Sequence, residues 1–175
     1  MSSSVPPFSE LLAACTHSAV HLEMRDQYGV DSEGDDFSTW LRTGRAEADP
    51  ASEYWAPWVD LISGAVARGV TVRRARIVSE PVSAYIRYEH AGTGVNLHAG
   101  EEVRWLPRRR ASDLALPGND FWLFDDRLIR WGYFSGDGAL TGHEISEDPA
   151  AAKLCAQAFE AVWERAVPHD QYKIH

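Results

Sequence analysis

Runs of alternating or continuous apolar residues predict most of the strands in this chain. Val70–Val78 combines β-branched residues with alternating arginines, which is typical of a strand. Two adjacent apolar runs, Phe121–Phe124 and Leu128–Phe134, are joined by an acidic turn and predict a β-hairpin. Further strands are predicted over residues 19–28, 102–106 and 139–145, although residues 9–28 could instead form one continuous helix.

Apolar residues at helical spacing predict five helices. They begin at Ser9 as N-cap, near Phe37, at Trp58, at Ser79-Glu80-Pro81, and at Asp148-Pro149. Gly44 and Gly69 end the second and third of these helices, the fourth reaches about Glu89, and Pro168 ends the last. Residues 92–100 are expected to form a loop. The alternation of helices and strands predicts an α/β fold with a mixed central sheet between flanking helices.

The chain of 175 residues is long enough for one domain, which we expect over residues 9–168, after a flexible N-terminus (1–8) and before a polar tail (169–175). No apolar run approaches the ~20 residues of a membrane span. The N-terminus has no basic segment followed by an apolar one, so it does not resemble a signal peptide. We therefore expect a cytoplasmic protein with no membrane partner.

The formal net charge is −9. Proteins that bind duplexes usually concentrate positive charge against the phosphates. Direct binding of nucleic acid is therefore not expected. The histidines lack ligand spacing, and no glycine-rich phosphate-binding motif is present. We accordingly predict no metal and no cofactor.

Alternation along the strand 70–78 places Arg74 and Arg76 on one face, which is unusual for a central strand. A buried arginine requires a carboxylate or an anionic ligand, because an unpaired buried charge is costly. Glu23 is the candidate carboxylate. Two interpretations stay open: a pocket that binds an anionic small molecule through bidentate guanidinium contacts, or an internal salt-bridge network.

Other polar residues are candidates for the same site. Glu23 and Arg25 share a strand face and could line a polar pocket with Tyr28, or that face could simply be solvated. Arg87 follows in the predicted helix 79–89, and Asp120 begins the hairpin. The predicted ligand-binding residues are thus Glu23, Arg25, Tyr28, Arg74, Arg76, Arg87 and Asp120.

From Trp58 onward, the order of elements resembles one half of a phospholipase D-like domain. The segments that carry this resemblance are Ala67-Arg-Gly-Val-Thr-Val-Arg-Arg74, Gly100-Glu-Glu-Val-Arg-Trp-Leu106, Asp120-Phe-Trp-Leu-Phe-Asp-Asp126 and Phe159-Glu-Ala-Val-Trp-Glu-Arg-Ala166. That family carries His-x-Lys-x-x-x-x-Asp, in which the histidine attacks phosphorus and the lysine neutralises the phosphoryl oxygens. Aligned on Asp125, those two positions hold Gly118 and Asp120. The resemblance therefore implies a half without phosphodiesterase activity.

Nearly the whole chain is also similar to an actinobacterial family, the domain of unknown function 6879. The segments that carry this similarity are His21-Leu-Glu-Met-Arg-Asp-Gln-Tyr28, Arg73-Arg-Ala-Arg-Ile-Val-Ser-Glu-Pro81, Tyr85-Ile-Arg-Tyr-Glu89 and the hairpin motif Asp120–Asp126. The family is often found beside helix-turn-helix regulators, so the resemblance implies a regulatory role and such a regulator as partner. Phospholipase D-like halves often pair two-fold, which implies a homodimer.

These observations favour a non-enzymatic regulatory or ligand-sensing protein. The alternative is an enzyme of unassigned type that uses Glu23 or Asp120 as acid or base beside the arginines. A cleft containing a carboxyl group of raised pKa would favour the enzyme. A sheet face filled by mutually paired charges would favour the non-enzymatic protein.

Overall fold

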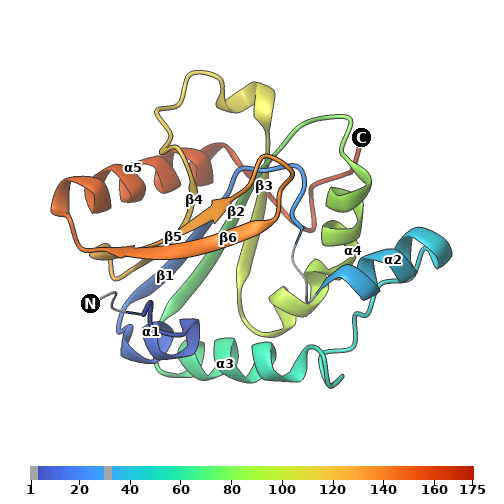
Figure 1. The fold of residues 1–175 in the computed structure, drawn as a ribbon, viewed down its shortest axis with the longest axis horizontal. Coiled ribbons are helices and arrows are strands. Elements are labelled where there is room, and N and C mark those ends of the chain that lie inside the picture. The colour runs from blue at the N-terminus through green and yellow to red at the C-terminus, as the bar shows by residue number, and fades with distance from the viewer. Residues whose placement is uncertain (1–3, 30–32) are drawn as a thin grey trace.

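A computed structural model describes residues 4–29 and 33–175. Its centre is a seven-stranded sheet in the order β6-β5-β4-β1-β2-β3-β7 (Figure 1). The strands are β1 (Ser18–Glu23), β2 (Thr71–Val78), β3 (Glu102–Pro107), β4 (Asp120–Phe124), β5 (Leu128–Phe134), β6 (Leu140–Ser146) and β7 (Val167–Pro168). The helices are α1 (Phe8–Ala14), α2 (Gly34–Thr43), α3 (Ala56–Ala67), α4 (Ala84–His98) and α5 (Pro149–Arg165), with a 3-10 turn, η2, over Arg108–Ala111.

The sheet is mixed, because one part of it is parallel and the other part is antiparallel. β1, β2 and β3 are parallel and are linked through helices. β4, β5 and β6 form an antiparallel meander, and β4 lies antiparallel to β1. The predicted fold class, a single α/β domain with a mixed sheet flanked by helices, is confirmed.

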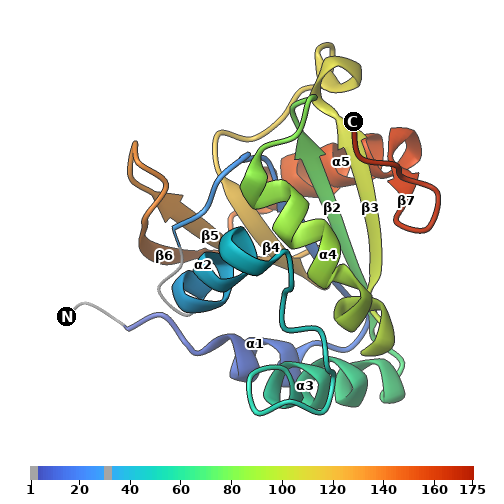
Figure 2. The same ribbon diagram turned by 90° about the vertical axis from the view of Figure 1, so that its right-hand side faces the viewer.

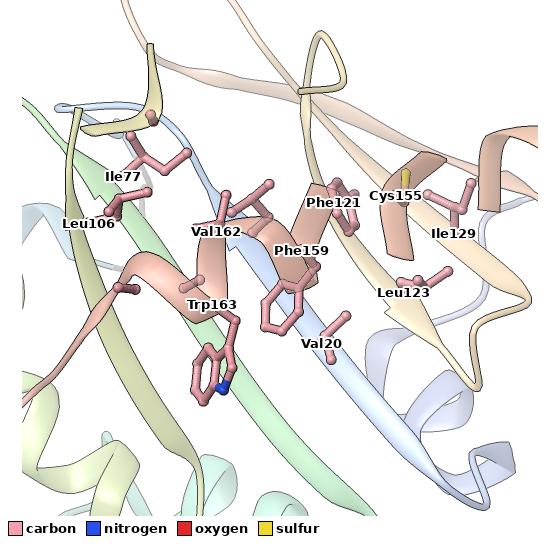
Figure 3. Close-up of a cluster of buried hydrophobic side chains, with 14 of the residues drawn as sticks. Val20, Ile77, Leu106, Phe121, Leu123, Ile129, Cys155, Phe159, Val162 and Trp163 are labelled. Atoms are coloured by element: carbon pink, nitrogen blue, oxygen red, sulfur yellow. The ribbon is translucent and has the colours of Figure 1, made fainter. Parts of the chain in front are cut away.

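The main core lies between one face of the sheet and α5. Alternate strand residues such as Val20, Leu123 and Ile129 pack in one cluster with Cys155 and Phe159 of that helix (Figure 3). The helix begins as predicted, with Asp148 as N-cap accepting a hydrogen bond from the Ala150 N–H at 3.0 Å. This apolar layer fixes the orientation of the strands, and their other alternate residues must face the opposite side.

The opposite face carries α1, α3 and α4, and Figure 2 shows α4 in front of β2 and β3 with α5 behind them. α3 packs on β2, α4 packs on β3, and α2 packs on α4. Apolar residues such as Ile62 and Val72 occupy one part of this face. Arginines and carboxylates occupy the part over the middle of β1 and β2, where the site lies.

Three predicted element boundaries are wrong. The strand expected over residues 19–28 ends at Glu23, and residues 24–28 lie outside any strand. The helix expected from Ser79 to Glu89 begins only at Ala84, because Ser83 caps it by accepting the Ile86 N–H at 3.1 Å. That helix then continues through the expected loop, residues 92–100, to His98. Burial of Val95 and Asn96 outweighs the low helix propensity of the two glycines in this segment.

The expectations for the chain ends also need correction. Ser9 lies inside α1 and caps nothing, since Pro7 occupies the N-cap position. Phe8, expected in a flexible N-terminus, stacks on Trp58 with ring centroids 5.4 Å apart. Tyr172, expected in a polar tail, is buried and stacks on Trp105 at 5.5 Å. The first three residues of the expected flexible segment lie outside the described residues.

Candidate functional site

Two rows of side chains run across the strands on the face opposite α5. In the first row Arg130, Trp122, His21 and Arg74 are register neighbours on β5, β4, β1 and β2. In the second row Glu23 of β1 is the neighbour of Arg76 on β2. Because side chains alternate between the two faces, both arginines lie on the same face of β2, as the sequence predicted. That face is the one opposite α5.

Arg74 and Arg76 are neutralised inside the protein. Glu23 lies between them, with one oxygen 3.0 Å from Arg74 Nη1 and the other 2.8 Å from Arg76 Nε. Arg76 Nη1 lies 2.5 Å from Glu89, and Arg74 Nε lies 2.5 Å from the fully buried Glu101. The predicted partnership with Glu23 is confirmed.

The charges of this network stabilise one another. Burial acts to raise the pKa of Glu23, but the guanidinium charges of Arg76 and Arg74 outweigh it and lower that pKa to about 2. Burial acts to lower the pKa of Arg74, but Glu101 and Glu23 raise it further above its usual value. Glu23, Arg74 and Arg76 are therefore ionised at neutral pH, so Glu23 has no proton to donate and is a weak base.

A cavity of about 610 Å³ lies above these two rows. Its walls come from β1, β2, β4, β5, β6, α3, α4 and the segments before α2 and before α3. The charged side chains of the walls are Glu23, Glu33, Glu47, Glu53, Glu89, Asp120, Arg74, Arg76 and Arg130. The aromatic side chains are Tyr28, Tyr54, Trp55, Trp58, Tyr85, Tyr88, Phe121, Trp122 and Phe134. The lining is completed by His21, His143, Asn96, Gly92, Gly132 and Leu140. The internal salt-bridge network expected as the second interpretation is thus present, and it forms the floor of a pocket.

One corner of the cavity holds two carboxyl groups around a tyrosine. The Tyr85 hydroxyl lies 2.5 Å from Glu33 Oε2 and 2.8 Å from Glu89 Oε1. The hydroxyl has a single hydrogen, so it donates to only one carboxylate at a time. Burial, together with the negative charge of Glu89, raises the pKa of Glu33 to about 7. Glu33 is therefore partly protonated at neutral pH.

Asp120 lies in the same corner and is held by two hydrogen bonds. One oxygen accepts the Met24 N–H at 2.9 Å, and the other accepts a short hydrogen bond from the Tyr28 hydroxyl. Burial raises the pKa of Asp120 to about 6, assisted by the charge of Glu23 and opposed by the Tyr28 hydrogen bond.

The structure brings five of the seven predicted site residues to the cavity: Glu23, Tyr28, Arg74, Arg76 and Asp120. The other two predicted residues, Arg25 and Arg87, do not line the cavity. The Arg25 guanidinium lies over the Phe134 ring, 5.3 Å from its centroid, and does not line the cavity. Arg87 is exposed, because it lies two positions from both Tyr85 and Glu89 and so points from the other side of α4.

Sequence reasoning missed several lining residues. Tyr85 and Glu89 are four positions apart in a helix, and this spacing alone could have placed both at the site. Arg130 alternates with buried Ile129 and could have been placed opposite α5 in the same way. Glu33 precedes a helix and Glu101 precedes a strand, so no periodicity marks them.

Asp125, the residue on which the phospholipase D motif was aligned, does not line the cavity. It lies in the β4–β5 turn with φ of 51° and accepts hydrogen bonds from the backbone N–H groups of Thr16, His17 and Ser18 at 2.9, 2.7 and 3.0 Å. These bonds fasten the hairpin to the segment between α1 and β1. Asp125 therefore has a structural role.

The described residues contain neither a cluster of metal ligands nor a helix suited to crossing a membrane. Across residues 4–29 and 33–175, no three His, Cys, Asp or Glu side chains converge in a way that could hold a metal ion. Within the same ranges, no helix combines the length and apolar character that a membrane crossing requires.

Comparisons with known proteins identify a family but no activity. The family model described as "Domain of unknown function (DUF6879)" matches residues 6–174. No curated protein matches the sequence. Among solved structures, Nuc, a phospholipase D family member from Salmonella typhimurium, is similar with a TM-score of 0.48 and 11% identity over 91% of this chain and 86% of that one. TrmBL2, an archaeal chromatin protein, has a TM-score of 0.48 and 14% identity over 91% of this chain, which spans about half (48%) of the TrmBL2 chain.

Proposed function

Because the chain belongs to the DUF6879 family, whose function is unknown, the site itself must carry the argument, and we propose that the chain senses a small molecule bound in the cavity. The observation that carries this proposal is a cavity of about 610 Å³ above a floor of mutually paired, buried charges. Small-molecule sites have volumes of about 300–1,000 Å³ and combine apolar walls with a few fixed polar groups.

The floor supports binding because it is rigid before any ligand arrives. Arg74 and Arg76 are each held by two carboxylates and retain 8% and 4% of their exposure. Preorganised groups bind without an additional ordering cost. The upper walls come from separate segments, including Glu33 before α2, Trp55 before α3 and His143 on β6. A ligand would link these segments, which is a physical basis for signalling occupancy.

The regulatory part of the proposal concerns partners. We propose that ligand occupancy alters binding to a helix-turn-helix regulator, which the DUF6879 resemblance implies. We also propose that the chain pairs as a homodimer, which the phospholipase D-like resemblance implies. Light scattering of the chain alone, and then mixed with the regulator encoded beside it, tests both parts. A strictly monomeric chain that forms no complex would remove them.

The binding proposal is tested by filling the cavity from α4. A Cβ at Gly92 would lie 3.9 Å from Trp55, its nearest neighbour, so Gly92→Leu extends a side chain into the cavity without a backbone clash. Gly94→Leu is the matched control, because Gly94 lies on the exposed side of the same helix with nothing near its Cβ position. Both changes raise helix propensity by a similar amount.

The measurement is a thermal-shift screen of a library of small amines, carboxylates and zwitterions against the wild-type chain and both variants. We expect compounds that raise the melting temperature of the wild type and of Gly94→Leu but leave Gly92→Leu unchanged. A library without such compounds, or shifts that persist in Gly92→Leu, would remove the proposed site.

An enzyme remains the second candidate, and the raised pKa of Asp120 is the observation that favours it. Both Asp120 oxygens already accept hydrogen bonds, which favours a structural role instead. We propose in addition that the chain is a phospholipase D-like half without catalytic residues, because Gly118 and Asp120 occupy the positions of the nucleophile and the cation. An assay with a generic phosphodiester substrate should then show no turnover.

A further inference from the structure

The lining of the cavity has an excess of negative charge. Six carboxylate residues line it against three arginines. Glu101 adds a further carboxylate behind Arg74. Since Glu23, Glu89 and Glu101 already outnumber Arg74 and Arg76, the floor offers no surplus positive charge to an anionic ligand.

Glu33 and Asp120 are the two lining carboxyl groups that are withdrawn from solvent and yet form no ion pair with a described residue. Each is held instead by a tyrosine hydroxyl, Glu33 by Tyr85 and Asp120 by Tyr28. The two tyrosine rings lie 5.9 Å apart. The positive charge of Arg25 acts on Asp120, so Glu33 is the carboxyl group that a ligand cation would pair with. A buried carboxylate without a positive partner is costly, and a bound cation would remove that cost.

Aromatic rings complete this corner. Tyr28 lies between Tyr85 and Phe134, with its ring centroid 5.1 Å from that of Phe134. The faces of such rings attract cations, and sites that combine aromatic walls with carboxylates are typical of ammonium recognition. The tyrosine rings therefore supply the same electrostatic preference as Glu33, whereas the Phe134 ring already carries the Arg25 guanidinium, 5.3 Å from its centroid.

The third arginine of the lining, Arg130, lies on β5. It forms no ion pair with any described residue and lies three strands away from Arg74 in the first row. Trp58 also lines the cavity and offers an aromatic surface. A positive ligand group would be repelled by Arg130 and attracted to Glu33, while an apolar body would pack on the aromatic side chains of the lining.

We propose that the cavity binds an organic cation, an amine or guanidinium on a flat apolar body, with its positive group at Glu33. This inference rests on the proposed function and specifies its ligand class. It replaces the anionic ligand expected from the sequence, because that expectation depended on Arg74 and Arg76 having free charge. The raised pKa of Glu33 is consistent with a carboxyl group that lacks its cation.

Isothermal titration calorimetry at pH 8 tests the ligand class with matched pairs that share a ring. The pairs are tryptamine against indole-3-acetate, and benzylamine and benzamidine each against benzoate. We expect at least one cation to bind at least tenfold more tightly than its carboxylate counterpart. Carboxylates that bind as tightly as the matched cations, or a set of cations none of which binds, would overturn the inference.

Glu33→Gln separates charge from shape, because it keeps an acceptor for the Tyr85 hydroxyl. We expect it to weaken the best cation at least tenfold, whereas Glu10→Gln on the exposed side of α1 has no effect. Unchanged affinity in a folded Glu33→Gln would also overturn the inference. If no cation binds but the thermal-shift screen finds other compounds that Gly92→Leu excludes, the ligand class fails while the proposed function stands. If that screen finds none, the proposed function fails as well.

Discussion

Glu23 Oε2 lies 2.8 Å from Nε of Arg76, its register neighbour across the parallel strands β1 and β2. Its other oxygen contacts Arg74, so a single carboxylate joins two buried guanidinium groups. Removing one partner from a buried ion pair leaves an uncompensated charge, which is far more costly than the net value of the pair.

Glu23→Gln should therefore lower the free energy of unfolding by about 3–5 kcal/mol, as measured by urea denaturation. Glu160→Gln is the matched control, because Glu160 pairs with the adjacent residue Arg73 but is 54% exposed. An exposed pair contributes at most about 1 kcal/mol. Equal losses in the two variants would show that the floor network does not behave as a buried ion-pair system.

Asp125 is predicted to matter for stability and not for catalysis. Asp125→Ala removes the acceptor for three backbone N–H groups and leaves alanine at a positive φ, so we expect a loss of about 2–4 kcal/mol. Asp125→Asn should lose less, because asparagine keeps one acceptor oxygen and tolerates this conformation. Urea denaturation measures both variants. Phosphodiester turnover that is present in the wild type and abolished by Asp125→Asn would contradict this assignment.

The strand rows of the site were predictable because side chains alternate in a strand. Val72, Arg74 and Arg76 had to share a face once Val70–Val78 was recognised as a strand, and an arginine pair on a central strand demanded a carboxylate. Glu23 met that demand from the neighbouring strand. The hairpin was equally predictable, because two apolar runs flank a short acidic turn.

The remainder of the site depends on contacts between distant segments, which local patterns do not encode. α4 crosses two glycines because its buried side chains stabilise it, so Glu89 and Asn96 reach the site from one helix and not from a helix and a loop. Glu33 and Glu101 carry no periodic signal and reach the site only through tertiary packing. Their charges reverse the electrostatic preference that two arginines suggested.

The pH dependence of stability should identify Glu33 as a buried carboxyl group without a cation. Its neighbours are Tyr85 and Glu89 on α4, Glu23 on β1 and Arg76 on β2, and its pKa is raised from 4.5 to about 7. The folded protein therefore binds the proton more tightly than the unfolded chain, so stability is lost as pH rises from about 4.5 through 7. Glu33→Gln removes this loss. We expect the variant to exceed the wild type by on the order of 1–2 kcal/mol at pH 8, after allowance for partial exposure, and to match it at pH 4.5.

Urea denaturation at pH 4.5 and pH 8 measures this difference. Glu10→Gln serves as the control and should follow the wild type at both pH values. The raised pKa of Asp120 gives a dependence of the same sign, so a residual loss at high pH should survive in Glu33→Gln. A variant that is less stable than the wild type at pH 8 would mean that Glu33 is ionised and stabilising in the folded protein, with a cationic partner already supplied by the chain.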